Sequence, residues 1–143
     1  MTVAAILKQK GRNIADVAPT ALVSDVAALL SERRIGAVLV RDAAEQLLGI
    51  VSERDIVNSM ARHGASVLTM TAGQLMTRNL QTATTRTTVA EAMALMTTGR
   101  FRHLPVMDGN TVVGIVSIGD VVKSRMDQQA HEVDSLKAYV SGK

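Results

Sequence analysis

The sequence predicts an α/β protein built from two similar units in tandem and followed by a C-terminal helix. Three observations support this prediction. Residues 49–57 (GIVSERDIV) recur as residues 114–122 (GIVSIGDVV), with six of nine positions identical. Each copy follows helix-like and then strand-like apolar patterning, and the last part of the chain has apolar residues at coiled-coil spacing. Units this small cannot bury their apolar faces alone, so we expect them to share one core.

The repeat extends over most of the chain. Residues 23–30 correspond to 89–96, and residues 35–40 correspond to 101–106, in both cases 66 positions further on. A turn that is one residue shorter in the second copy reduces the offset to 65 for the final segment, as is typical of surface turns. We therefore expect a first repeat at 1–64, a second repeat at 73–126, a connection around 64–72 and a helical extension at 127–143.

A helix is expected at the start of each repeat. Apolar residues recur at helical spacing, namely Val26, Leu29 and Leu30 in the first copy and Val89, Ala92, Met93 and Met96 in the second. Ser24 and Thr88 are the expected N-caps. Thr88 is followed three residues later by Glu91, which fits a capping box.

Two strands and a second helix complete each repeat. Residues 35–40 and 47–51 are expected to form one hairpin, and residues 104–107 and 112–116 a second. The second helices are expected to begin at Ser52 and Ser117. Short strand-like segments near Ile14 and Leu80 should precede the first helices.

The composition indicates a globular protein with an aliphatic core. Hydrophobic residues make up 47% of the chain but aromatic residues only 1%, and cysteine is absent. The absence of cysteine excludes disulfides, thiolate catalysis and cysteine-bound zinc, and three scattered histidines give little support to a metal site. No run of 18 apolar residues and no secretory leader pattern is present. We therefore expect a cytoplasmic location and no membrane partner.

The charge of the chain suits an anionic partner without specifying it. The formal net charge is +3 and the pI is about 9.7. Basic residues are spread along the chain, and Phe101 and Tyr139 are the only aromatic residues available to stack on bases. Nucleic acid is therefore a disfavoured partner.

The turn from each repeated strand into its second helix is a candidate anion site. Gly-Ile-Val runs into Ser52 or Ser117, and the first backbone N–H groups of a helix that starts there can face a phosphate. Asp55 and Asp120 lie three residues further on and can accept hydrogen bonds from hydroxyl groups. The same Ser-x-x-Asp pattern is also a helix-capping arrangement, and the two interpretations are compatible.

Two motifs in the second repeat resemble the cystathionine-β-synthase-type (CBS) domain family. They are residues 102–108 (RHLPVMD) and residues 114–120 (GIVSIGD), and the resemblance extends over about residues 3–126. It implies two repeats packed about a pseudo-twofold axis, as in small stand-alone bacterial CBS proteins. It also implies an adenine nucleotide ligand such as AMP, ADP, ATP, NAD or S-adenosylmethionine in a cleft between the repeats.

The resemblance assigns roles to particular residues. Asp55 and Asp120, beside Ser52 and Ser117, are expected to bind ribose hydroxyls. Arginines grip phosphate oxygens well, so the expected phosphate contacts are Arg102 and His103, assisted by Arg100. The segments that lead into the first helices are expected to contact adenine through backbone groups, at Asp16, Val17, Thr82 and Ala83.

The first repeat departs from the family pattern. It has Gly36 and Ala37 where the second has Arg102 and His103, and Leu39 where the second has Pro105. Positive charge there can come from Arg33, Arg34 and Arg54 instead. We therefore expect the site with Ser117 and Asp120 to dominate.

The sequence predicts binding without catalysis. No nucleophile with a neighbouring base, no carboxylate pair and no P-loop motif is recognisable. We expect a regulatory or sensor module that signals to an effector protein whose identity the sequence does not reveal. Two alternatives stay open, a protein-interaction scaffold with vestigial clefts and a weak nucleic-acid binder.

The tail predicts a homodimer. Val122, Met126, Gln129, Val133, Leu136 and Val140 follow the alternating spacing of a helical seam. Such a seam can pack on a second copy of the chain or across its own subunit. We expect the former, because little core is left to cover beyond the second repeat.

Overall fold

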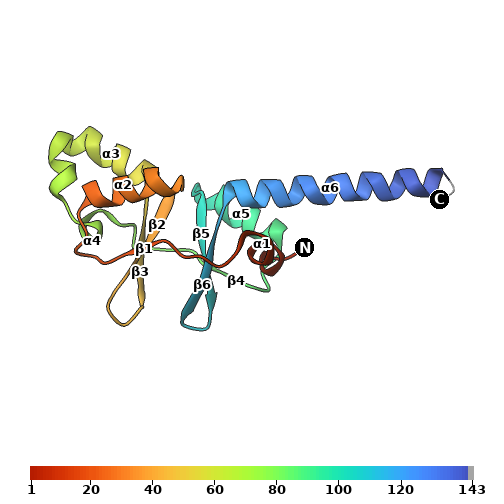
Figure 1. The fold of residues 1–143 in the computed structure, drawn as a ribbon, viewed down its shortest axis with the longest axis horizontal. Helices are drawn as coiled ribbons and strands as arrows, with labels where there is room; N and C mark the ends of the chain where they lie inside the picture. Colours follow the sequence, from red (N-terminus) through yellow and green to blue (C-terminus); the bar gives the residue numbers. More distant parts are fainter. Residues whose placement is uncertain (142–143) are drawn as a thin grey trace.

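The computed structural model describes residues 1–141 and has two similar halves, each with a three-stranded sheet (Figure 1). In each sheet a short strand pairs in parallel with the first strand of an antiparallel hairpin. This confirms the predicted α/β class with two tandem repeats. The strands are β1 (Asp16–Val17), β2 (Ala37–Arg41), β3 (Leu47–Ser52), β4 (Ala83–Thr84), β5 (His103–Asp108) and β6 (Thr111–Ser117).

Helices flank both sheets and form the end of the described chain. The order helix, strand, strand, helix holds in both repeats, with β1 and β4 as the short leading strands. These strands begin two and three residues after Ile14 and Leu80, around which they were expected. The helices are α1 (Val3–Lys10), α2 (Val23–Arg33), α3 (Glu53–His63), the 3₁₀ helix η1 (Gly64–Thr69), α4 (Ala72–Leu75), α5 (Val89–Gly99) and α6 (Ile118–Val140).

Three of the four predicted helix starts are confirmed. Thr88 caps α5 and Glu91 completes its capping box, while Ser52 and Ser117 cap α3 and α6. The prediction for Ser24 is wrong, because α2 begins at Val23 with Leu22 as its N-cap. Leu22 forms a β-bridge with Thr71, which holds the backbone extended one residue before Val23. Ser24 therefore lies inside the first turn.

Helix α1 precedes the first repeat but packs on the second, and helix α4 precedes the second repeat but packs on the first. In α1, Val3, Ile6 and Leu7 belong to the core of the second half. Ala72 of α4 belongs to the core of the first half, and the backbone N–H of Ala72 donates to Ala21 O at 2.7 Å. The halves in space therefore differ from the predicted division at 1–64 and 73–126.

The two halves meet through their sheets about a pseudo-twofold axis. A third apolar cluster joins Ala37, Leu39 and Ile50 of the first hairpin to Val112 of the second. The other two clusters lie inside the separate halves. Because strand and cluster residues from both repeats make this central contact, neither repeat is complete without the other.

The predicted C-terminal helix is the outer part of one continuous helix. α6 has 23 residues, and only its first turns pack on the second half, with Val121 and Ser124 buried. The outer part projects from the body of the molecule (Figure 1). Two residues of the predicted extension at 127–143, residues 142 and 143, lie outside the described part. Within residues 1–141, no helix is long and apolar enough to span a membrane.

Candidate functional site

Both Ser-x-x-Asp turns form complete capping boxes. The Ser52 backbone N–H donates to Asp55 Oδ2 at 2.8 Å, and the Asp55 N–H donates to Ser52 Oγ at 3.2 Å. Ser117 and Asp120 make the same two bonds, at 2.8 and 3.1 Å. The capping interpretation is therefore confirmed in both repeats.

The capping bonds change the expected anion site. The N–H of Glu53, the first residue of α3, donates to Gly36 O at 2.9 Å, and that of Asp55 is held by Ser52. Ile118 N–H donates to Arg102 O in the same way in the second repeat. Two of the first three amides of each helix are thus already paired, so a phosphate here depends mainly on side-chain cations.

A cleft of about 270 Å³ lies between the two repeats beside the first of these turns. Ser52, Arg54 and Asp55 from the first repeat line it together with a basic segment of the second. It therefore has the position that a ligand in contact with both halves requires. The lining residues are Gly36, Ile50, Ser52, Glu53, Arg54, Asp55, Thr77, Asn79, Leu80, Gln81, Arg100, Phe101, Arg102 and His103.

The basic wall of the cleft comes from the turn between α5 and β5. Arg100 closes α5 in a left-handed conformation with φ of 56°, and Arg34 closes α2 with φ of 54°. The segment then runs through Arg102 into β5. All three predicted phosphate contacts, Arg100, Arg102 and His103, line this one cleft.

His103 of the second repeat lies beside Gly36 of the first, at the boundary between the two repeats. Burial lowers its pKa, as do the neighbouring charges of Lys10 and Arg102, and these effects outweigh Asp120 and Glu53, which raise it. The imidazole is therefore neutral at pH 7. A phosphate placed beside it would favour its protonated form.

The structure groups the predicted residues differently from the sequence. Arg102 and His103 were expected beside Ser117 and Asp120, and His103 does pair with Ser117 across the β5–β6 hairpin. Ser117 and Asp120 are nevertheless not among the residues that line the cleft, whereas Ser52 and Asp55 are. Each repeat therefore supplies a different part of one site. An assignment of one complete site to each repeat does not find this combination.

The segment beside the cleft is Asn79–Leu80–Gln81, and not the predicted Thr82 and Ala83. Ala83 begins β4 and is only 2% exposed, so its side chain belongs to the core of the second half. Thr82 is exposed and does not line the cleft. The sequence held a signal for the segment that lines the cleft, because Arg78-Asn79-Leu80 repeats Arg12-Asn13-Ile14 at the 66-residue offset.

Asp16 and Val17 also lie outside the lining of this cleft. Asp16 forms an ion pair with Arg41, whose Nη2 lies 2.5 Å from Asp16 Oδ2. Val17 packs against the core of the first half. Neither residue of β1 therefore lines the cleft.

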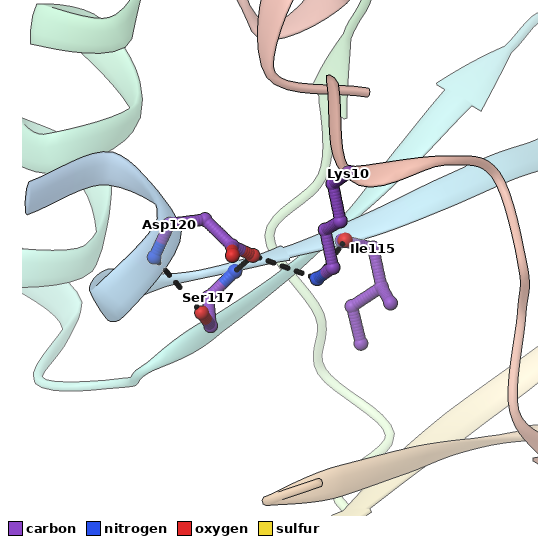
Figure 2. A network of polar contacts seen from close by, with 4 residues as sticks. All are labelled: Lys10, Ile115, Ser117 and Asp120. Carbon is purple, nitrogen blue, oxygen red and sulfur yellow. Dashed lines mark hydrogen bonds and ion pairs between the residues drawn. The ribbon is translucent and has the colours of Figure 1, made fainter. Parts of the chain in front are cut away.

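Lys10 occupies the second Ser-x-x-Asp turn (Figure 2). Its Nζ lies 2.6 Å from Asp120 Oδ2 and donates to Ile115 O at 3.0 Å. Burial alone would raise the pKa of Asp120, but hydrogen bonds from Lys10 and Ser117, with the positive charge of Lys10, lower it. Asp120 is therefore ionised and neutralised from within the chain.

Metal binding has no visible basis in the described part of the chain. Residues 1–141 contain no group of three histidine, cysteine, aspartate or glutamate side chains arranged to hold a metal ion. The charged and titratable groups that line the cleft are instead three arginines, a half-buried histidine and the carboxylates of Glu53 and Asp55, and Ser52, Thr77, Asn79 and Gln81 add neutral polar groups. This donor set suits a ligand that combines hydroxyl groups with negative charge.

Two α/β repeats that share a cleft of this kind define a tandem-repeat binding module. The chain belongs to the CBS domain family, whose model matches residues 11–62 and 72–127. CBS pairs of this kind are regulatory modules, and relatives that consist of CBS domains alone are regulatory rather than catalytic.

Known CBS proteins match nearly the whole chain. It is 35% identical to CBSX3, a mitochondrial CBS protein of Arabidopsis thaliana, over 99% of this chain and 72% of CBSX3. The solved structure of ATU1752 from Agrobacterium tumefaciens is 41% identical, with a TM-score of 0.85 over 87% of this chain and 92% of that one. A CBS-domain protein from Burkholderia ambifaria MC40-6 is 39% identical, also at 0.85, over 90% and 96%.

One further structure of the family holds a nucleotide. CBSX2, solved in complex with AMP, is 25% identical and has a TM-score of 0.71 over 90% of this chain and 98% of CBSX2. Some relatives are much longer, and the chain spans only 24% of the plant protein CBSCBSPB1. The CBS pair is thus found both alone and as part of larger proteins.

Proposed function

We propose that this chain is a non-catalytic sensor that binds an adenine nucleotide in the cleft between its repeats. The observation that carries the proposal is the meeting of Asp55, from the first repeat, with Arg102 and His103, from the second. A ligand there contacts both halves of the molecule. Binding can therefore change how the repeats sit against each other, which is the change an effector protein would detect.

The lining assigns a part of the nucleotide to each group of residues. Asp55 lines the cleft and uses Oδ2 for the capping box, while Oδ1 lies 3.4 Å from Thr77 Oγ1. This oxygen is the proposed acceptor for ribose hydroxyls. Arg54, Arg100 and Arg102 are the proposed phosphate ligands, and they give the cleft a cationic wall.

The proposed base contact is the segment that leads into the second repeat. Asn79, Leu80 and Gln81 offer backbone groups to the edge of an adenine, and Ile50 and Leu80 offer apolar surface to its face. Apolar walls with a few polar groups are typical of small-molecule sites. Asp16, Val17, Thr82 and Ala83 are not part of this proposal.

The charge of the cleft favours phosphate-bearing ligands. Three arginines suit AMP, ADP, ATP or NAD better than S-adenosylmethionine, whose sulfonium group is positive. The complex of the related CBSX2 with AMP supports AMP as the first ligand to test. We propose no cofactor role for the nucleotide.

The test is a thermal-shift series on protein freed of co-purified ligand. A ligand at one hundred times its dissociation constant adds about 2.7 kcal/mol of stability, which corresponds to a melting shift of several degrees for a chain of this size. We expect shifts with adenine nucleotides and none with GMP. Native mass spectrometry of untreated protein would identify a co-purified nucleotide directly. No shift with any adenosine compound would contradict the proposal.

We also propose that α6 forms a homodimer, because its predicted seam is exposed. Val133 is 50%, Leu136 63% and Val140 76% exposed, so the seam does not pack across its own subunit. In a parallel pair of these helices, Glu132 of one copy would face Lys137 of the other across the seam. This opposite charge favours a second copy as the partner. A scaffold function without ligand is the alternative that this surface supports.

A further inference from the structure

We propose that Lys10 closes the second repeat's counterpart of the cleft, so that each chain binds one nucleotide and not two. This inference rests on the proposed nucleotide-binding function. A pair of repeats related by pseudo-twofold symmetry offers two equivalent positions, one at Asp55 and one at Asp120. The contacts at these two positions are different in kind.

At the first position, main-chain groups occupy the strand edge and leave the aspartate accessible. Thr77 exchanges two backbone hydrogen bonds with Ile50, of 3.1 and 2.9 Å. Its hydroxyl lies 3.4 Å from Asp55 Oδ1, at the outer limit of a hydrogen bond. Asp55 therefore lines the cleft with one oxygen free of any strong bond in the described part of the chain.

At the second position, a side-chain ammonium takes the place of these groups. Ile115 corresponds to Ile50 at the 65-residue offset, and its carbonyl accepts from Lys10 Nζ at 3.0 Å. The same Nζ lies 2.6 Å from Asp120 Oδ2 (Figure 2). This is the oxygen that accepts the Ser117 backbone N–H. A charged hydrogen bond of this length is among the strong ones.

The residue that ends α1 explains why only one position is closed. At the 66-residue offset α4 (72–75) corresponds to residues 6–9 of α1, and Lys10 lies one residue beyond this matched part. The similarity between repeats resumes directly afterwards, with Arg12-Asn13-Ile14 matching Arg78-Asn79-Leu80. Met76 stands in the second repeat where Lys10 stands in the first, so the first position has no equivalent cation from this segment.

The surroundings reinforce the closure. The Lys10 and Asp120 side chains are 37% and 24% exposed, so the pair is partly shielded from water and salt. A ribose hydroxyl would have to displace an ammonium group that is tethered in the same chain. The second position also has a reduced basic wall, because Gly36 and Ala37 stand where the first position uses Arg102 and His103, and only Arg34 corresponds to Arg100.

The test is the number of AMP molecules bound per chain, measured by native mass spectrometry and calorimetry on nucleotide-free protein. We expect one for the wild type and two for Lys10→Ala, with the second site weaker. Lys8→Ala is the matched control, because Lys8 is an exposed lysine of the same helix, and it should stay at one. Adding Asp120→Asn to Lys10→Ala should return the count to one, and Lys10→Met gives a second variant if Lys10→Ala folds poorly.

The possible results separate the inference from the proposed function. Two AMP molecules on the wild type, or one on both Lys10 variants when these are folded by circular dichroism, would overturn the closure and leave the nucleotide function intact. No AMP on any variant would overturn the proposed function, and the closure with it. A second readout does not depend on ligand, since Lys10→Ala should raise the NMR-measured pKa of Asp120.

Discussion

Gly36 and His103 face each other across the boundary between the two repeats. A Cβ atom on Gly36 would lie 3.0 Å from His103 Nε2 and 3.1 Å from Cε1. We expect Gly36→Ala to push the imidazole ring of His103 aside, because the end of a side chain moves more readily than backbone. AMP affinity should fall several-fold while the stability changes by less than about 1 kcal/mol. Calorimetry and thermal unfolding measure the two effects.

A double-mutant cycle provides the control for this prediction. In a His103→Ala background the clash is gone, so Gly36→Ala should have almost no further effect on AMP affinity. Equal losses in both backgrounds would show that Gly36 acts on the ligand or the fold by another route. The same cycle isolates the contribution of His103.

His103 should make phosphate binding depend on pH. Its pKa is lowered in the folded chain, mainly by burial and then by Lys10. A bound phosphate favours the protonated imidazole. AMP binding near pH 6.5 should therefore be accompanied by proton uptake, equal to the increase in the protonated fraction of His103. Calorimetry in two buffers of different ionisation enthalpy measures this uptake. His103→Asn should remove it, and His131→Asn, a change on the exposed part of α6, should not.

The lowered pKa of His103 should also make the stability of the ligand-free protein depend on pH. A histidine whose pKa is lower when folded contributes full stability above its unfolded pKa of about 6.5. That contribution declines as the pH falls through 6.5 towards the folded pKa. Urea unfolding at pH 7.5 and 5.5 should therefore show a smaller loss for His103→Asn than for the wild type. An identical loss would contradict a buried neutral His103.

Gly49 should be far less tolerant of a side chain than its counterpart Gly114. A Cβ on Gly49 would lie 2.7 Å from the Thr77 carbonyl oxygen, which accepts the Ile50 N–H. A Cβ on Gly114 would lie 2.7 Å from Leu7 Cδ2, the movable end of a side chain. We expect Gly49→Ala to cost about 2–3 kcal/mol and Gly114→Ala about 1 kcal/mol. Chemical unfolding of both variants measures the difference, and equal costs would refute it.

Removal of the outer part of α6 should abolish or weaken the dimer without unfolding the chain. Truncation after Met126 removes the seam beyond the buried positions Val121 and Ser124. Sedimentation at micromolar concentration should show a smaller dimer fraction than for the full chain, with a nearly unchanged melting temperature. Leu136→Lys should act in the same direction, and Asp134→Lys, off the seam, should not. A dimer that persists after truncation would remove α6 from the interface.

The arrangement inside each repeat could be predicted from the sequence because its determinants are local. Helical spacing, the hairpin turns and the Thr88–Glu91 and Ser-x-x-Asp caps each involve residues that are close in the chain. The contents of the site could not be predicted to the same extent. Asp55 meets Arg102 only after the repeats pack, and Lys10 reaches Asp120 across 110 positions because α1 packs on the other repeat.

The segment before β4 shows a second limit of the sequence. Thr82 and Ala83 were expected to contact adenine through backbone groups, but Ala83 fills the core of the second half and neither residue lines the cleft. Burial of a small apolar residue is a tertiary requirement that spacing alone does not reveal. The repeated Arg-Asn-Leu/Ile triplet marks the segment that lines the cleft in the second repeat, and β1 and β4 begin two and three residues after its last residue.

The proposed nucleotide lies between Asp55 of one repeat and Arg102 of the other. Calorimetric titration of nucleotide-free protein with AMP and with adenosine tests this position most directly. We predict that Asp55→Asn weakens both ligands at least tenfold, while Arg102→Ala weakens AMP and leaves adenosine nearly unchanged, because only AMP has the phosphate. Asp25→Asn, an exposed change in the first turn of α2, should alter neither. AMP binding that survives both Asp55→Asn and Arg102→Ala unchanged would contradict the account.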